Sequence, residues 1–334
     1  MSPTKSDGME ISMKYNMTPI NYLENVLDNK IFIKRDDLLP FSFGGNKIRI
    51  AEEFFEDMKK GEYDCIVGYG NARSNLSRAI ANLSQKYNIE CYIISPSDED
   101  GSRIETGNSK IVKACGAKFV TCDKHSVSAC VKNVLSECRK NGKKPYYIYG
   151  NEFGEGNEAT PLKAYVKVYE EIKEQEKQLR TTFDYIFLAT GTGMTQGGLL
   201  IGQAKAGDEK KIEGISIARK AEYEAAVLKK MLAAYKDEIE NVDLDKIEIN
   251  VVDDYMCGGY GKYNNDVAKT SNYLLLDFGI PTDLTYTGKA YYGMKEFVKA
   301  QGIKNKNILF VHTGGTPLFF DDLEAIKNCK EADK

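Results

Sequence analysis

The stretch DCIVGYGNARSNLSRAIANLSQK, residues 64–86, decides the fold class. Residues 64–70 form a short apolar run that predicts a buried strand. A glycine-containing turn follows, and Ser74 then opens a segment with the apolar spacing of a helix that extends to Lys86. This strand–turn–helix unit is the building block of α/β proteins.

The same unit recurs along the chain. Helical patterns follow near 103–115 and 126–140, and Thr160-Pro161 predicts an N-cap and first-turn proline for a long helix. Further strands are predicted at 91–96, 117–122, 145–150, 184–190, 211–218, 246–255 and 307–313. This alternation predicts an α/β fold with two open, twisted, mostly parallel sheets, whose ligands bind at the carboxyl ends of the strands.

The chain length of 334 residues predicts about two domains. One sheet takes the strands between 64 and 150, and the other takes those between 184 and 313 together with KIFIKRDD, residues 30–37. We therefore expect a large domain of residues 1–49 and 160–334 and a small domain of residues 50–159.

Composition excludes several classes of protein. The net charge is −3 without a basic tail, which argues against nucleic acid as a partner. No apolar run approaches a membrane span, and residues 1–14 lack the pattern of a secretion signal. The eight cysteines form no C-x-x-C pair and the chain has two histidines, so we expect reduced thiols, no metal site and a cytoplasmic protein.

Five glycine-containing segments carry the chemistry. FSFGGNKIR (41–49) presents Lys47 from a turn without bulky side chains, although a surface turn that ends in lysine reads the same. LATGTGMTQGGLL (188–200) places Gly191, Thr192, Gly193 and Thr195 before a helix, which predicts either an anion cradle or an ordinary tight turn.

In GNARSNLSRA (70–79), Ser74 and Asn75 stand where a helix N-terminus meets a small anion, or where a serine simply caps it. LTYTGKAYYGM (284–294) and VHTGGTPLF (311–319) place Thr-Gly pairs beside aromatic and polar groups. Taken alone, Tyr286 and His312 favour a structural interpretation. Together, a phosphate cradle, an accessible lysine and a second anion site predict pyridoxal 5′-phosphate held as a Schiff base.

From about residue 15 to 325 the chain resembles the fold-type II (tryptophan synthase β-like) pyridoxal-phosphate enzymes, in the group of D-cysteine desulfhydrases and 1-aminocyclopropane-1-carboxylate deaminases. The resemblance rests on KRDDLLPFSFGGNKIR, GNARSNLSRA, TGTGMTQGGL, YTGKAYYGM and HTGGTPLF in this order. It implies that Lys47 forms the Schiff base, that Asn75 contacts the ring hydroxyl, and that Ser74 binds the substrate carboxylate. It further implies that Tyr260 and Tyr286 are active-site tyrosines, and that the phosphate is held by Gly191, Thr192, Gly193, Met194 and Thr195.

Two positions separate the subgroups within this resemblance. Thr287 follows the second tyrosine, at the position that meets the pyridine nitrogen in this family. The deaminases have glutamate at this position, and the desulfhydrases have threonine or serine. Thr313 follows the histidine, where the deaminases have leucine. Both positions indicate the desulfhydrase side.

Two departures bear on the substrate. Leu76 stands where the family usually has glutamine or histidine on the substrate carboxylate, so it offers only its backbone N–H. Ile50 stands where many relatives carry a second lysine near the phosphate, with Arg49 adjacent. We therefore expect a substrate that is larger than D-cysteine or differently oriented.

The sequence predicts a pyridoxal-phosphate-dependent lyase that converts a β-substituted amino acid into a 2-oxo acid and ammonia by α,β-elimination. Lys47 is the predicted base for the α-proton, and Tyr260 or Tyr286 assists the leaving group. A β-replacement synthase, a 1-aminocyclopropane-1-carboxylate deaminase and a non-catalytic binding protein are the alternatives. The resemblance also implies a homodimer.

Overall fold

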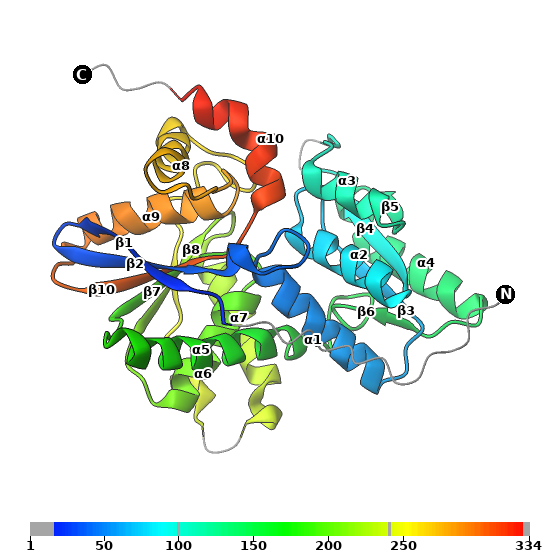
Figure 1. Cartoon of the computed structure of the whole chain (residues 1–334). Helices are drawn as coiled ribbons and strands as arrows, with labels where there is room; N and C mark the ends of the chain where they lie inside the picture. Colours follow the sequence, from blue (N-terminus) through cyan, green and yellow to red (C-terminus); the bar gives the residue numbers. More distant parts are fainter. Residues whose placement is uncertain (1–16, 99–100, 240–241, 330–334) are drawn as a thin grey trace.

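The computed structural model describes residues 17–98, 101–239 and 242–329, which form two sheets flanked by helices (Figure 1). Residues 1–14, where we expected no secretion signal, lie outside this range. In the described part of the chain, no helix is both long and apolar enough to cross a lipid bilayer.

The larger sheet has an almost entirely parallel topology. Its six strands in spatial order are β1 (Ile20–Val26), β2 (Asn29–Arg35), β10 (Asn307–His312), β7 (Tyr185–Thr190), β8 (Lys211–Ser216) and β9 (Asn250–Val252). β2 lies beside β10 with Ile31 level with Ile308, although 277 positions separate the two residues in the chain. As expected, residues 30–37 therefore join the sheet built from the later strands.

Strand β1 was not predicted from the sequence. It pairs antiparallel with β2 through a hairpin whose turn residues Leu27 and Asp28 have φ values of 49° and 65°. Two left-handed residues in succession match the twist of a hairpin. This edge strand is the antiparallel element of an otherwise parallel sheet.

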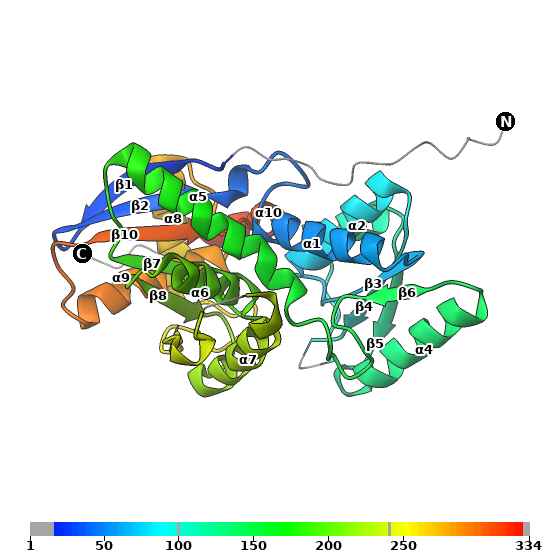
Figure 2. The same cartoon turned by 90° about the horizontal axis from the view of Figure 1, so that it is seen from below.

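Helices cover both faces of the larger sheet (Figures 1 and 2). One face carries α5 (Lys163–Leu179), α6 (Met194–Ala206) and α7 (Ala221–Ala234), and the other carries α8 (Asn265–Phe278) and α9 (Thr287–Ala300). Each face has its own hydrophobic core, since neighbouring residues of one strand point to opposite sides; Phe187 packs with α9 and Leu188 with α6.

The smaller sheet is parallel throughout, with the spatial order β5-β4-β3-β6. Its strands are β3 (Cys65–Tyr69), β4 (Glu90–Pro96), β5 (Lys118–Cys122) and β6 (Pro145–Tyr147). Its helices are α2 (Asn75–Tyr87), α3 (Gly107–Ala114) and α4 (Val127–Lys140). The expected α/β class with two mostly parallel sheets is confirmed.

Helix α1 (Asn46–Lys60) lies at the seam between the two sheets, packed on both α2 and α5 (Figure 2). On its inner side Arg49 contacts Glu171 at 2.6 Å and Asp36 at 3.4 Å, and Lys34 contacts Glu171 at 3.1 Å. Arg49 is therefore committed to a buried ion network that anchors the start of α1. The remaining helix, α10 (Thr316–Lys327), packs on α8 and α3.

Three local predictions were wrong. Thr160 does not cap a helix: Thr160–Leu162 form a 3-10 turn without a side-chain cap, with Pro161 in the first turn as predicted, and α5 begins at Lys163. The strand expected at 246–255 shrinks to β9, since this edge pairs with β8 over three residues. The helix expected from 103 begins at Gly107, where Thr106 forms a capping box with Ser109.

Candidate active site

A cavity of about 1100 Å³ lies where strands of both sheets end. Tyr69 and Pro96 at the ends of β3 and β4 line one side. Thr190 at the end of β7, Ile217 after β8 and Thr313 after β10 line the other. The expectation that ligands bind at the carboxyl ends of the strands identifies this cavity as the candidate site.

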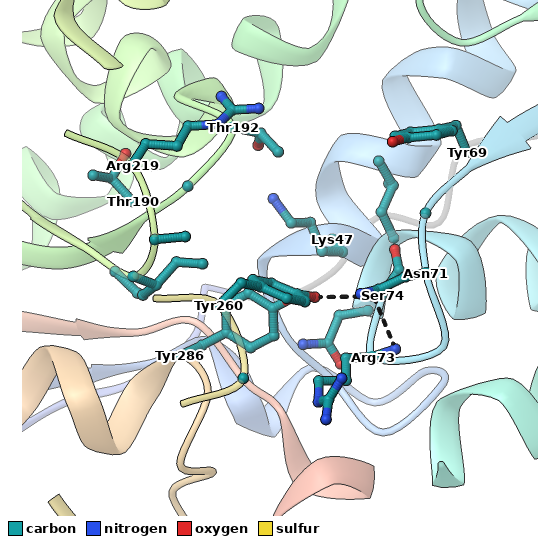
Figure 3. A pocket seen from close by; sticks show the side chains of 18 of the residues that line it. Lys47, Tyr69, Asn71, Arg73, Ser74, Thr190, Thr192, Arg219, Tyr260 and Tyr286 are labelled. Atoms are coloured by element: carbon teal, nitrogen blue, oxygen red, sulfur yellow. Dashed lines mark hydrogen bonds between the residues drawn. The ribbon is translucent and has the colours of Figure 1, made fainter. Parts of the chain in front are cut away.

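Lys47 enters the cavity from the second position of α1 (Figure 3). The two preceding glycines are required by the backbone, because Gly44 and Gly45 have φ values of 67° and 100°. A Cβ on Gly45 would lie 2.8 Å from the carbonyl oxygen of Thr313, and one on Gly44 would lie 2.1 Å from that of Asp37. The glycines thus let the lysine turn pass against two backbone segments.

The Lys47 amine is poised to act as a base or nucleophile. Burial lowers its pKa to about 8, and the charge of Glu224 opposes that shift. No side chain in the described ranges holds this amine by a hydrogen bond. An amine with a depressed pKa reacts with an aldehyde more readily than an ordinary surface lysine.

Opposite Lys47, the turn between β7 and α6 is the segment that we predicted to be an anion cradle, and it lines the cavity just before the N-terminus of α6. Gly193 caps α6 with a φ of 75°, and no acidic residue lies in the first turn of this helix. Asn46, the neighbour of Lys47, donates from Nδ2 to Thr195 Oγ1 at 2.8 Å. The lysine turn and the cradle are therefore held at a fixed separation.

The N-terminus of α2 forms a second polar wall. Ser74 caps the helix by accepting from the Ser77 backbone N–H at 3.1 Å, as expected. Asn75 accepts a hydrogen bond from Asn108 Nδ2 at 2.9 Å, which fixes the Asn75 amide at the cavity edge. Leu76 also lines the cavity and is 4% exposed.

Tyr260 and Tyr286 complete the wall below Lys47 in Figure 3. Their hydroxyl groups share a short hydrogen bond, and Tyr260 donates to Asn71 Oδ1 at 3.2 Å. Burial raises the pKa of both phenols well above that of free tyrosine, so both are neutral at physiological pH.

The structure separates the two threonines that distinguish the subgroups. Thr313 lines the cavity. Thr287 does not: it is fully buried, and its hydroxyl donates to Asp283 Oδ2 at 2.9 Å. All other residues expected in the site lie together around the one cavity, namely Lys47, Ser74, Asn75, Leu76, Gly191, Thr192, Gly193, Met194, Thr195, Tyr260 and Tyr286.

Several lining residues were not identified from the sequence. Asn46 directly precedes Lys47, and Asn71 and Arg73 lie three positions and one position before Ser74. Closeness in sequence to a predicted site residue was therefore the signal that could have identified them. Arg219 follows β8 and pairs with the buried Glu224 at 3.2 Å. Nothing local in the sequence indicates that Arg219 reaches the cradle, because a crossover of the sheet brings it there.

The donor set fits pyridoxal phosphate. The glycine turn before α6 offers backbone N–H groups and hydroxyls to a phosphate, while Lys47 offers an amine without a competing acceptor. A Cβ on Gly191 would lie 2.9 Å from the Ile217 side chain, so any larger residue at this position would clash with Ile217. Fold and cavity together define the class of enzymes that bind a phosphorylated aldehyde through a lysine.

Comparison with known proteins agrees with this class of enzyme. The family model described as "Pyridoxal-phosphate dependent enzyme" matches residues 11–314. The chain belongs to this family and is a pyridoxal-phosphate-dependent enzyme, as the motifs predicted.

Relatives of two kinds align over nearly the whole chain. A "Putative 1-aminocyclopropane-1-carboxylate deaminase" of Pyrococcus furiosus is 31% identical over 89% of each chain. A "D-cysteine desulfhydrase" of Serratia proteamaculans is 27% identical over 90% of this chain and 91% of its own. The crystal structure of an "ACC deaminase homologue" superimposes with a TM-score of 0.81 at 27% identity, covering 95% of this chain and 94% of that one.

Proposed function

We propose that the protein is a lyase that catalyses α,β-elimination of a β-substituted amino acid, as D-cysteine desulfhydrases do. The observation that carries this proposal is the position of Lys47. Its unpaired amine, with a pKa of about 8, stands between the glycine cradle on one side and the α2 N-terminus with the tyrosine pair on the other. A base placed between a cofactor site and a substrate site suits proton removal from an amino acid.

The chain's own residues divide the work. Bound pyridoxal phosphate would supply an aldehyde that joins an amino group and a ring that accepts the electron pair released at the α carbon. The N–H groups that open α6 and Thr192 would hold the phosphate. Ser74, Asn75 and the Leu76 N–H would orient the substrate carboxylate.

Lys47 would then take the α-proton on Nζ. The bond between the β carbon and its substituent breaks, and the substituent departs with the bonding electron pair. The remaining amino acid skeleton hydrolyses to a 2-oxo acid and ammonia. Thr313, at the cavity wall, and Thr287, behind it, are the residues we assign to the pyridine side.

We also propose a homodimeric, cytoplasmic protein, with a large domain of residues 1–49 and 160–334 around a small domain of residues 50–159. The grouping of the strands into two sheets supports this division. Sedimentation analysis gives the mass in solution, and a mass of 37.4 kDa would contradict the dimer.

Absorbance spectra test the cofactor anchor, and product analysis tests the reaction. Purified protein loaded with pyridoxal phosphate should show a long-wavelength absorbance band that Lys47→Ala abolishes. Lys262→Ala, an exposed lysine at the same cavity, should retain the band. A band that survives Lys47→Ala would contradict the assignment of the anchor.

An accepted β-substituted amino acid should release its substituent and a 2-oxo acid in equal amounts, which for D-cysteine are sulfide and pyruvate. A holoenzyme that leaves D-cysteine intact would point to Leu76 and a larger or differently oriented substrate. Release of sulfide from D-cysteine without formation of pyruvate, in the presence of an added thiol, would instead favour the replacement synthase. Conversion of 1-aminocyclopropane-1-carboxylate to a four-carbon 2-oxo acid would favour the deaminase, the activity in the printed name of the Pyrococcus relative.

A further inference from the structure

Asn71, in the loop after β3, is hydrogen-bonded to the tyrosine pair (Figure 3). Its Oδ1 accepts from the Arg73 backbone N–H at 3.1 Å and lies 3.2 Å from the Tyr260 hydroxyl. Its Nδ2 donates to Asp98 Oδ1 at 3.1 Å. The Asn71 side chain therefore connects the small-sheet wall of the cavity with a tyrosine of the other wall.

These contacts fix which end of the amide faces Tyr260. A backbone N–H can only donate, and the Asp98 carboxylate, paired with Arg73 at 3.2 Å, can only accept. In a flipped amide, Nδ2 would face the Arg73 backbone N–H, so that two donors meet. Oδ1 would face the Asp98 carboxylate, so that two acceptors meet. The amide oxygen thus faces Tyr260, and an amide oxygen can only accept.

The direction of the protons follows along the chain of hydroxyls. A phenol has one proton, and Tyr260 donates its proton to Asn71. The hydrogen bond between the two phenols must therefore carry the proton of Tyr286.

We propose that Asn71 is a positioning residue that turns the protons of the tyrosine pair away from the substrate. Tyr286 then presents lone pairs to the cavity, so the pair accepts a hydrogen bond from a bound amino acid and does not donate one.

The chemical consequence rests on the proposed function. When the bond to the β-substituent breaks, chloride or thiolate departs as a stable anion, whereas a hydroxyl substituent needs a proton in the same step. A pair whose protons point to Asn71 withholds that proton, contrary to the prediction that Tyr260 or Tyr286 assists the leaving group. The geometry thus selects amino acids whose β-substituent leaves as a stable anion.

Ligand binding to the holoenzyme tests the proton direction without turnover. D-serine can donate from its side chain, whereas O-methyl-D-serine can only accept. We expect Asn71→Ala to lower the preference for D-serine over O-methyl-D-serine by roughly fivefold, the equivalent of about 1 kcal/mol for one hydrogen bond. The affinities come from the change in cofactor absorbance before product forms. Steric differences between the ligands cancel when the two proteins are compared.

Leaving-group selectivity supplies a second readout. Asn71→Ala frees the Tyr260 proton, so the rate of elimination from D-serine relative to 3-chloro-D-alanine should rise about tenfold. Ile104→Ala is the matched control, since it removes an apolar side chain from the same cavity. Tyr286→Phe should abolish the binding preference, because it removes the acceptor.

Unchanged ratios in Asn71→Ala, or the same changes in Ile104→Ala, would overturn the proposal. If Asn71→Ala does not fold, Asp98→Ala removes the acceptor of the Asn71 amide nitrogen and should shift both ratios in the same direction. If no compound undergoes elimination while the binding preference responds to Asn71→Ala, the proposed function fails and the proton direction stands.

Discussion

The pKa of Lys47 reflects two opposing environments. Burial favours the neutral amine, whereas the negative charge of Glu224 favours the ammonium. Glu224 itself is fully buried behind the cradle, where it accepts from Thr190 and pairs with Arg219. The carboxylate therefore sets how much neutral amine is available at a given pH.

Replacing this carboxylate should shift the pH dependence of cofactor loading. In Glu224→Gln the pKa of Lys47 falls further, both because the negative charge is lost and because the charge of Arg219 is no longer balanced. We expect the midpoint for the loading rate of cofactor-free protein to move down by about 1 pH unit. Glu222→Gln, an exposed neighbour on α7, is the control. A midpoint common to all three proteins would exclude this coupling.

Single residues could be predicted where the features that they depend on lie in one short segment of the chain. Two glycines before Lys47 signalled the unusual backbone that the structure requires. The role of Asn71 could not be predicted in this way, because it depends on Tyr260, 189 positions away in the chain. The commitment of Arg49 to Glu171 likewise needed the fold.

At the scale of elements, α6 depends on glycine for its packing as well as for its cradle. A Cβ on Gly202 would lie 2.3 Å from Cβ of Tyr169, and one on Gly198 would lie 2.5 Å from the backbone oxygen of Leu162. Tyr169 is fully buried and donates to Asp208 at 2.7 Å, so it cannot move aside freely. Helices α5 and α6 therefore approach through a glycine face.

This packing makes a stability prediction for Gly202→Ala. Alanine favours a helix by about 1 kcal/mol over glycine. Overpacking against Tyr169 costs about 1–3 kcal/mol, and we expect it to exceed the helix gain, so the free energy of unfolding should fall by up to about 2 kcal/mol. Urea unfolding followed by far-ultraviolet circular dichroism measures it, since the chain contains no tryptophan.

Lys205→Ala, on the exposed side of the same helix, should change the free energy of unfolding by less than about 0.5 kcal/mol. A Gly202→Ala protein as stable as the parent, or more so, would show that the two helices can separate without cost.

At the scale of the whole molecule, the described structure contains no disulfide, and all eight cysteines are free. Cys65 and Cys91 lie in buried strands, where burial raises the pKa of each thiol to about 12 and suppresses reaction. Stability therefore comes from the packed cores on both faces of the sheets and not from covalent links.

Thiol titration checks this prediction. Denatured protein prepared without reductant should yield eight thiols, and prior reduction should add none. The native protein should react more slowly at Cys65 and Cys91 than at the partly exposed Cys329. A count that rises after reduction would indicate a disulfide and contradict the reduced state.

The sequence by itself determined the α/β class, most strands and the two glycine turns that precede Lys47 and α6, because each depends on contacts within about 20 neighbouring residues. Hydrophobic runs and glycine turns act locally, so they can be recognised without coordinates. Only the tertiary structure decided which walls meet at the cavity, since β3, β7 and β10 are brought together by crossovers of the two sheets. It also decided the direction of the tyrosine protons and the burial of Thr287, because both depend on partners from other elements or on packing.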